Sequence, residues 1–508
     1  MKKTNTDNCA FETITIFNRK FFFLLGALSL LAFIKMLIIY YFPMDLHSEE
    51  AQYWVWSKHL QLSYYSKPPL IAYMNWVSSM IFGNTVLGIR INAVVIGFLI
   101  SVATYFLTFE IFKDVNKAVM ASLSTCIFPF LISISSYFST DSPLLFFWIL
   151  AMLFFWKAIE VRKWIWWVLF GISVGLGAMA KYSMFLIYIP LLVFSVMYYR
   201  EIFRKWGFYL SILISLLLFS PVIYWNIQQG GLGVLHVVHL AGANNHSHSV
   251  LNAFLNLLVF ILGQFAILLP FYQYNILFHK IRQRSFTKQE IFLALPAICM
   301  FLIFMFVALI RRSGANINWV MFGYMGIQIL FAHFAIANNQ SKFAFRISVA
   351  MITALILFTW IISSSNTIFP LGKSNPANKM IGWSKVASKI DLMKDHLPTS
   401  ESYVFSPNYH IASEMWFYLK GQPETYVLNP GTRMTQFDLW PGIEQFINSD
   451  KVAIFVDGQK ISPEVRNGFR EVLKTDSCQV FSQNQHIETY YIYFLKGLKG
   501  FQKRHTSY

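Results

Sequence analysis

Charged residues are scarce in this sequence, and acidic residues are scarcer than basic ones. Only 13% of the 508 residues are charged, whereas a soluble globular domain carries roughly 25%. Hydrophobic residues reach 56% and aromatic residues 18%. These values exclude a disordered chain, a fibrous repeat and an ordinary cytosolic enzyme. The composition predicts an integral membrane protein.

Cysteine is also rare, and two common motifs are missing. The four cysteines form no CxxC pair and show no metal-finger spacing, so we expect no disulfide framework. No GxxxxGK[ST] sequence is present to bind a nucleoside triphosphate. The net charge of +17 could indicate nucleic acid, but many basic residues lie in short clusters between apolar runs, as in residues 200–205 and 280–284. This spacing is typical of the cytoplasmic ends of membrane helices, and we expect no nucleic-acid partner.

The apolar runs predict a polytopic, mostly α protein. Residues 21–42 form an apolar run too long for a cleaved signal peptide, so we interpret it as an uncleaved first span. Ten more spans are predicted, giving about eleven in all: 88–112, 118–137, 142–157, 164–180, 182–199, 206–226, 251–278, 291–310, 317–337 and 344–363. Lys and Arg in the connections favour a cytoplasmic N-terminus by roughly three to one. An odd number of spans then puts the C-terminus outside.

Two outer segments differ from the spans. Residues 43–87 are aromatic and polar, and they predict interfacial helices over 51–60 and 70–82. After residue 363 the charge density rises. Strands are predicted at 402–406 and 452–456, and helices at 379–395 and 411–419. We therefore expect a transmembrane domain over 1–363 and a small α/β outer domain over 364–508.

The segment after the first span carries the richest set of chemical groups. Glu49 and Glu50 lie there, followed by Lys67 before two prolines. Ser48 is a plausible N-cap, and acids in the first turn of a helix suit its dipole, so a purely structural role is a real alternative. Lys67 could likewise extend to lipid headgroups.

Other charged residues are predicted on the same membrane side. Asp141 could cap the next helix, yet an acid at the bilayer edge is costly unless it is paired or solvated. Lys181, Arg311 and Arg312 are candidates for binding a phosphate, with headgroup anchoring as the alternative. The predicted outer loop also holds four histidines, His236, His239, His246 and His248. Their spacing gives only weak support for a metal, because no carboxylate accompanies them.

Several motifs resemble bacterial members of the dolichyl-phosphate-mannose–protein mannosyltransferase superfamily (glycosyltransferase family 39 and its relatives, which include the lipid A 4-amino-4-deoxy-L-arabinose transferase). The resemblance extends over nearly the whole chain. It is carried by SEEAQYWVWS at 48–57, YYSKPPLI at 64–71, STDSPLLFFW at 139–148, SPVIYWN at 220–226, IASEMWFYL at 411–419 and QFDLWP at 436–441.

The resemblance implies a GT-C fold and a sugar donor carried on a polyprenyl phosphate. It implies that Glu49 fills the position of the catalytic acid, usually Asp, with Glu50 after it as a further candidate catalytic residue, and it leaves open which of the two is the base. Asp141 matches the second acidic position, and Lys67 matches the lysine that contacts the donor phosphate. In the aminoarabinose branch an acid commonly precedes that lysine and helps to bind a metal. Ser66 stands there instead, so support for a divalent metal is weak and no cofactor is assigned.

The chemistry of such a transfer fits these residues. A fixed cation stabilises the charge that develops on the departing phosphate, a role assigned to Lys67, with Arg311 or Arg312 second. A carboxylate takes the proton of the acceptor hydroxyl, a role assigned to Glu49, with Asp141 orienting the base or acceptor. An in-line displacement inverts the anomeric centre. Further candidates for contacting substrate are Tyr64, Tyr65, His236 and His239.

The predicted function is therefore transfer of a sugar from a polyprenyl phosphate to an envelope acceptor such as lipid A, a glycan or a protein, at the outer face of the bacterial inner membrane. Two alternatives remain open: a flippase or transporter of lipid-linked sugars, and an O-antigen ligase or polymerase. A transporter would need neither the outer acids nor the outer domain. Paired broken helices in two corresponding halves would favour it, and the sequence shows no such halves.

Overall fold

The computed structural model of the chain describes residues 16–126, 128–240, 250–268, 282, 285–311, 314–338, 376–395, 401–429, 431, 433–482 and 485–501. These residues fall into two compact units. The first, here called the helical unit, comprises Met1–Leu37, Lys67–Ile71 and Arg90–Leu355. The second, called the outer unit after the sequence prediction for the C-terminal part of the chain, comprises Ile38–Ser66, Ala72–Ile89 and Ile356–Tyr508. Part of the segment after the first span thus groups with the C-terminal part of the chain, and the predicted boundary at residue 363 stays a prediction.

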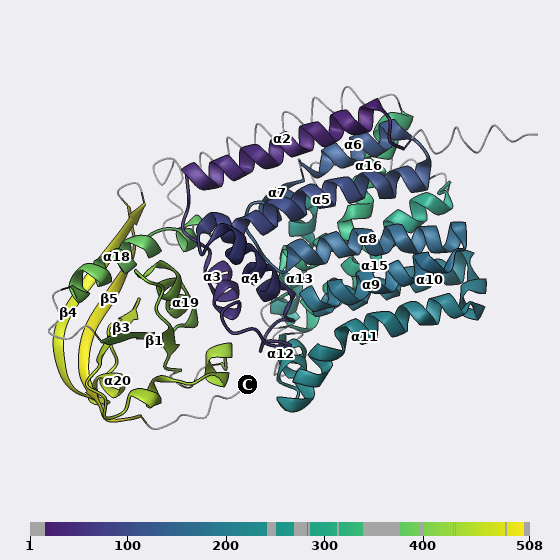
Figure 1. Cartoon of the computed structure of the whole chain (residues 1–508). Coiled ribbons are helices and arrows are strands. Elements are labelled where there is room, and N and C mark those ends of the chain that lie inside the picture. Colours follow the sequence, from purple (N-terminus) through teal and green to yellow (C-terminus); the bar gives the residue numbers. More distant parts are fainter. Residues whose placement is uncertain are drawn as a thin grey trace, which may run out of the picture. The chain divides into compact units, whose positions relative to one another are not determined.

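The helical unit is built from long apolar helices, which Figure 1 shows running beside one another. Six helical segments are long and apolar enough to cross a membrane among the described residues. They are α2 (Arg19–Tyr41), α5 (Val86–Phe112), α8 (Asp141–Val161), α11 (Trp206–Gln228), α15 (Lys288–Ile310), and η3 (Ile317–Tyr324) continued by α16 (Met325–Ala337). The shorter helices are α6 (Val115–Thr125), α7 (Pro129–Ile134), α9 (Trp164–Ala180), η1 (Tyr182–Ile187), α10 (Tyr188–Tyr198), η2 (Arg200–Arg204), α12 (Leu232–Leu240) and α13 (Val250–Leu268).

Glycines let several of these helices approach closely. A Cβ atom added at Gly171 of α9 would lie 2.5 Å from the carbonyl oxygen of Ser211 in α11. A Cβ at Gly326 of α16 would lie 1.8 Å from the carbonyl oxygen of Leu293 in α15. Small residues at helix contacts permit this packing, which replaces the hydrophobic driving force that is weak inside a bilayer.

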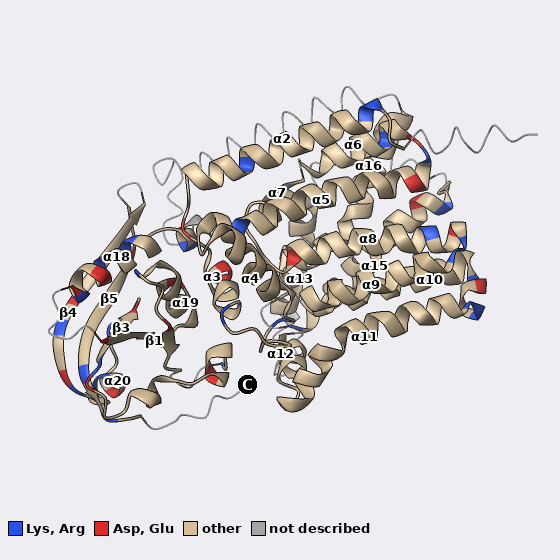
Figure 2. Cartoon of the chain, in the orientation of Figure 1, with Lys and Arg blue, Asp and Glu red and all other residues tan. Residues whose placement is uncertain are grey.

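The outward surface of the helices is apolar, and charge lies mainly at their ends. Large side chains such as Phe23, Leu217 and Phe306 are 80%, 61% and 61% exposed, which a soluble surface would not tolerate over so many helices. Figure 2 shows Lys, Arg, Asp and Glu mostly near the helix ends, with long uncharged stretches between them. The protein is a multi-pass membrane protein, as the composition predicts.

Most predicted spans coincide with helices, but one does not. The run 118–137 is predicted as a single span, whereas the structure has α6 ending at Thr125 and α7 beginning at Pro129. This prediction was wrong because Pro129 lacks an N–H and favours the first turn of a new helix over the middle of an old one. The predicted span 344–363 lies outside the described residues, as does the end of 251–278, so the total of eleven stays a prediction.

The outer unit contains two helices from the segment after α2 and a five-stranded mixed sheet. The helices are α3 (Ser48–Trp56) and α4 (Leu70–Phe82), which begins in the helical unit's short segment. The sheet order is β2-β1-β3-β5-β4, with β1 parallel to β2 and β3, and β5 antiparallel to β3 and β4. Its strands are β1 (Ser402–Ser406), β2 (Thr425–Val427), β3 (Val452–Asp457), β4 (Phe469–Ser482) and β5 (Gln485–Leu498).

Two apolar layers form the core of this unit. One contains α18 (Trp383–Lys394) and α19 (Tyr409–Tyr418), packed on residues such as Ile454 and Phe494. The other contains Phe405, Phe455 and Phe469. The remaining short elements are η5 (Pro376–Met380), η6 (Gln436–Leu439), η7 (Ile443–Phe446) and α20 (Pro463–Asn467). The predicted strands at 402–406 and 452–456 are present, but β2, β4 and β5 are not predicted by the sequence pattern.

Candidate functional site

Helix α3 begins with a reciprocal cap that uses Glu50. His47 is the N-cap, and its Nδ1 accepts a hydrogen bond of 3.2 Å from the backbone N–H of Glu49. In return, the backbone N–H of His47 donates to Oε2 of Glu50 at 2.9 Å. The sequence suggests Ser48 as the cap, which is wrong by one residue. A histidine ring nitrogen can accept like a serine oxygen, and this choice puts Glu50 in the position where a capping box needs a carboxylate.

The two adjacent acids therefore have different surroundings. Glu50 is 0% exposed and its carboxylate completes the cap, whereas Glu49 is partly exposed. A group that takes a proton from an acceptor must come within hydrogen-bond reach of it. The partly exposed Glu49 is the better placed of the two for that proton transfer, whereas the carboxylate of Glu50 completes the helix cap.

Side chains of the C-terminal part of the chain hold the segment around Glu49. The backbone N–H of Leu46, three residues before Glu49, donates to the hydroxyl of Tyr418 at 2.6 Å. The backbone N–H of Tyr65, two residues before Lys67, donates to Oε1 of the fully buried Gln436 at 2.7 Å. Both partners lie in IASEMWFYL or QFDLWP, so the sequence motifs contained them, although no role for either could be assigned from spacing.

Tyr409 and His410 at the start of α19 interact with residues of the first turn of α3 and its cap. Burial raises the pKa of Tyr409, the neighbouring Arg433 opposes this rise, and the carboxylate of Glu49 adds to it. Burial also lowers the pKa of His410 to about 4, and His47 nearby contributes to the lowering. Glu49 thus interacts with Tyr409, and His410, the next residue, is neutral at pH 7.

Tyr64 and Tyr65, predicted to contact substrate, are both buried. The hydroxyl of Tyr64 donates to the carbonyl oxygens of Trp56 at 2.9 Å and of His59 at 3.1 Å. Its ring stacks on Trp56 with centroids 4.5 Å apart. Through these contacts, Tyr64 stabilises the turn that follows α3.

In the helical unit, Asp141 and Lys181 form a close ion pair. The Nζ atom of Lys181 lies 2.6 Å from Oδ1 of Asp141, and the two side chains are 18% and 15% exposed. Asp141 begins α8 and Lys181 is the C-cap of α9. Each charge therefore also suits its own helix dipole. The structure brings these two predicted residues together across 40 positions of sequence.

The other predicted phosphate ligands have different settings. Lys67 is half-buried and belongs to the helical unit. Arg311 caps α15, donates from Nη1 to the carbonyl oxygen of Gly314 at 3.1 Å, and lies over the ring of Trp319 at 5.2 Å. These contacts give Arg311 a packing role. Arg312 lies outside the described residues.

Histidines 236 and 239 lie on a helix, α12, where the sequence predicts a loop. His236 is 4% exposed and His239 is half-buried. His246 and His248 lie outside the described residues. No group of three or more His, Cys, Asp or Glu side chains in the described part of the chain is arranged to hold a metal ion.

The predicted residues are thus divided between the units. Glu49, Glu50, Tyr64 and Tyr65 lie in the outer unit, and Lys67, Asp141, Lys181, His236, His239 and Arg311 lie in the helical unit. Among these residues, Glu50 and not Glu49 takes part in the cap of α3, and Asp141 forms an ion pair with Lys181. That all of them share one site stays a prediction.

Comparison with known proteins confirms the predicted resemblance. Residues 66–225 match the family model described as dolichyl-phosphate-mannose–protein mannosyltransferase. The fold is similar to that of ArnT from Cupriavidus metallidurans, with a TM-score of 0.63 at 13% identity, covering 93% of this chain and 97% of that one. This likeness shows the GT-C fold.

Curated relatives match by sequence over shorter stretches. The lipid A galacturonosyltransferase RgtD of Rhizobium johnstonii is 26% identical over 327 residues, which are 60% of this chain and 64% of that protein. The undecaprenyl phosphate-alpha-4-amino-4-deoxy-L-arabinose arabinosyl transferase of Pseudomonas savastanoi pv. phaseolicola is 26% identical over 31% of this chain and 32% of its own length. The chain therefore spans less than two thirds of the length of these relatives.

Proposed function

We propose that this chain, related by its family match and its GT-C fold to the dolichyl-phosphate-mannose–protein mannosyltransferases, is a membrane glycosyltransferase. It moves a sugar from a polyprenyl phosphate carrier to an acceptor of the cell envelope. The observation that carries the proposal is that the family match over residues 66–225 contains Lys67, Asp141 and Lys181, two of which form the ion pair at the end of α8.

The named relatives support the choice of donor and acceptor. RgtD is a lipid A galacturonosyltransferase, and the arabinosyl transferases are named for an undecaprenyl phosphate-linked sugar. ArnT of C. metallidurans has also been crystallised bound to undecaprenyl phosphate. For this chain we infer a polyprenyl-phosphate sugar as donor and lipid A, another glycan or a protein as acceptor.

The reaction breaks the bond between the anomeric carbon and the phosphate oxygen of the carrier. The acceptor oxygen forms the new bond from the opposite side, which inverts the anomeric centre, and its proton passes to Glu49. Lys67 stabilises the negative charge that appears on the departing phosphate. A base placed for such a step contributes about 10²–10⁴-fold to the rate.

The remaining residues support this chemistry. Asp141 orients the acceptor or the base, and Lys181 holds Asp141 and offers a cation to the donor phosphate. Arg311, Arg312, His236 and His239 are assigned as weaker substrate contacts, Tyr64 and Tyr65 as residues that shape the site, and Glu50 as the cap that fixes α3. No metal or other cofactor is assigned.

We place the reaction at the outer face of a bacterial inner membrane, with the N-terminus in the cytoplasm and the C-terminal domain in the periplasm. The excess of Lys and Arg in alternate connections supports this orientation. A donor dissolved in the membrane suits that face, where nucleotide sugars are not supplied.

The test is transfer by purified protein from a polyprenyl-phosphate sugar to lipid A. Glu49→Gln should abolish transfer, because an amide cannot take the proton, while the protein still inserts and elutes as a folded species. Glu464→Gln provides a matched control, because Glu464 also lies in the first turn of a helix in the same unit. Normal transfer by Glu49→Gln would remove Glu49 as the base.

A further inference from the structure

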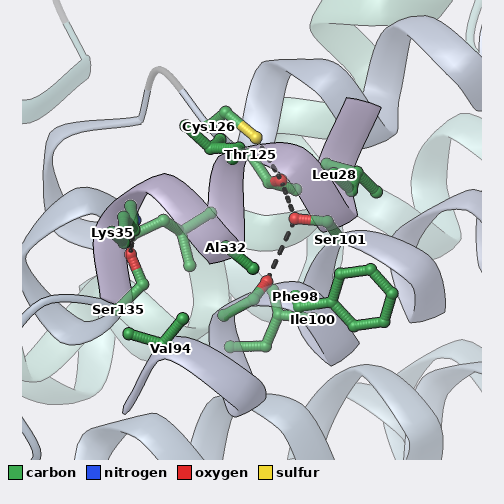
Figure 3. Close-up of a pocket in the computed structure, with 13 residues that line it drawn as sticks. Leu28, Ala32, Lys35, Val94, Phe98, Ile100, Ser101, Thr125, Cys126 and Ser135 are labelled. Carbon is green, nitrogen blue, oxygen red and sulfur yellow. Dashed lines mark hydrogen bonds between the residues drawn. The ribbon is translucent and has the colours of Figure 1, made fainter. Parts of the chain in front are cut away.

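Several polar contacts in this chain join segments that are far apart in the sequence. Figure 3 shows one of them, in which Lys35 of α2 is directed at Ser135 at the end of α7 and donates to its Oγ at 2.5 Å. That contact joins two segments of the helical unit. A contact with a bearing on the proposed reaction lies in the outer unit, where Gln436 of η6 meets the loop that precedes Lys67.

Gln436 is fully buried and uses both ends of its amide on this loop. Its Oε1 accepts the backbone N–H of Tyr65 at 2.7 Å, and its Nε2 donates to Oε1 of Gln61 at 3.2 Å. An amide can accept at one atom and donate from the other without carrying a charge. All three residues belong to the outer unit. Two hydrogen bonds therefore tie the C-terminal part of the chain to the loop between α3 and α4.

Asp438 fixes the turn that carries Gln436. Its Oδ2 accepts from the backbone N–H of Thr435 at 2.6 Å and from the hydroxyl of Thr435 at 2.9 Å. The same oxygen accepts from Nδ2 of Asn429 at 3.1 Å. Hydrogen bonds to a carboxylate are stronger than those between neutral groups, so the start of η6 is well held. Gln436 thus reaches the loop from a fixed backbone.

The loop is held a second time at Gln61. The hydroxyl of Tyr73 in α4 donates to the carbonyl oxygen of Gln61 at 2.8 Å. The backbone N–H of Gln61 donates to the hydroxyl of Tyr64 at 3.3 Å. The loop is therefore fixed at residue 61 and again at residue 65, directly before the segment that contains Lys67.

Only Ser66 separates the anchored Tyr65 from Lys67. Pro68 follows Lys67, and a residue before proline is restricted to extended backbone conformations. Pro68 and Pro69 are buried, and each has a fixed φ angle. Few backbone conformations are therefore left to Lys67. Holding Tyr65 in place sets the direction in which the chain enters Lys67 and from which its side chain extends.

We propose that Gln436 is a positioning residue for Lys67. It holds the backbone at Tyr65 so that the amine of Lys67 meets the phosphate of the polyprenyl carrier. This inference rests on the proposed function, in which Lys67 contacts the donor phosphate. Gln436 acts through the loop and is assigned no contact of its own with the donor.

The test is binding of undecaprenyl phosphate to the purified full-length protein in detergent, measured by native mass spectrometry. Gln436→Met should weaken binding by about tenfold, the scale of one charge-assisted hydrogen bond. In a Lys67→Met background the same substitution should change the affinity by less than about twofold, because the lysine through which Gln436 acts is gone. A loss of equal size in both backgrounds would overturn the proposal, since a general loss of structure acts on both.

Gln422→Met is the matched control. Gln422 is also a glutamine of the outer unit, and its Nε2 donates to the carbonyl oxygens of Asn84 at 3.2 Å and Phe417 at 2.9 Å. Neither of these residues lies in the loop that leads to Lys67. Binding of undecaprenyl phosphate by Gln422→Met should therefore equal that of the wild type, and a loss as large as that of Gln436→Met would contradict a specific role for Gln436.

Hydrogen–deuterium exchange at the amides of residues 63–67 gives a second readout that needs no substrate. Exchange of the Tyr65 amide should be faster in Gln436→Met, because its acceptor is lost, and an unchanged rate would overturn the proposal. Transfer is assayed separately. A wild type that binds undecaprenyl phosphate but transfers no sugar would remove the proposed function, whereas the binding comparison would still decide the role of Gln436.

Discussion

Helix α8 carries a half-buried ion pair at each end, and the two pairs look alike at first. At its start, Asp141 meets Lys181 at 2.6 Å; near its end, Lys157 meets Glu110 of α5 at 2.5 Å. The acids are 15% and 13% exposed and the lysines 18% and 20%. Distance and burial therefore cannot tell a functional pair from a structural one.

The two ion pairs differ in how their charges are placed relative to the helix dipoles. Glu110 lies in the last turn of α5, where a negative charge is unfavourable, and it is met by two lysines, Lys157 and Lys113. Lys157 also lies 4.3 Å from the ring of Trp166. Asp141 and Lys181, by contrast, each suit the helix end on which they lie. We therefore expect the Glu110 pairing to serve the fold, and we propose that the charges of Asp141 and Lys181 act on a substrate.

The largest difference is expected between substitutions of the two acids, Asp141 and Glu110. Asp141→Asn should reduce transfer by about 100-fold, the scale of a misplaced base or acceptor, and it should lower the free energy of unfolding less than Glu110→Gln does, because one lysine and not two loses its partner. Glu110→Gln should leave transfer within about twofold and lower the free energy of unfolding by about 1–3 kcal/mol, because two lysines lose their partner. Transfer assays and unfolding in detergent measure both. The opposite assignment of the two effects would show that Asp141 is the structural acid.

Replacing the lysines should give a smaller contrast. Lys181→Met should lower transfer by about tenfold, because Asp141 loses its partner and the donor phosphate loses a nearby cation. Lys157→Met should leave transfer unchanged, because Glu110 keeps Lys113 at 2.6 Å. The rate is measured against donor concentration for both variants. An equal loss of transfer in the two variants would show that Lys181 has no role that Lys157 lacks.

Glu50 provides a structural acid from the outer unit. Glu50→Gln keeps an oxygen that can accept from the backbone of His47 but loses the charge at a helix N-terminus, so we expect a loss of about 1 kcal/mol in unfolding free energy. Transfer should fall much less than in Glu49→Gln. A larger loss of transfer in Glu50→Gln would exchange the roles of the two acids.

The smallest effect concerns pH. Burial lowers the pKa of His410 to about 4, with His47, Lys379 and Arg433 contributing and the carbonyl of Ser48 opposing. The unfolded chain therefore binds a proton near pH 6.5 that the folded chain does not bind until near pH 4, so the outer unit loses stability as pH falls through that window. His410→Gln should remove part of this pH dependence. An unchanged dependence between pH 7 and 5 would assign it to other groups.

Much of the fold could be predicted from the sequence, because long apolar runs and turn residues act locally. The helices α2, α5 and α8, together with strand β1, follow from such runs. The break at Pro129 was missed because the apolar run continues through it. The hairpin of β4 and β5 was missed as well, because many residues of β4 are polar and exposed, which leaves no regular alternation of apolar and polar residues.

The candidate site divides in the same way. The sequence by itself determined the membrane class, the resemblance and the identity of the acids and lysines, because composition and motifs need no coordinates. The structure adds that Glu50 completes a local cap with His47, and only the tertiary packing decided that Asp141 meets Lys181. The ion pair depends on how α8 and α9 pack against each other, because Asp141 begins one helix and Lys181 ends the other, 40 positions apart along the chain.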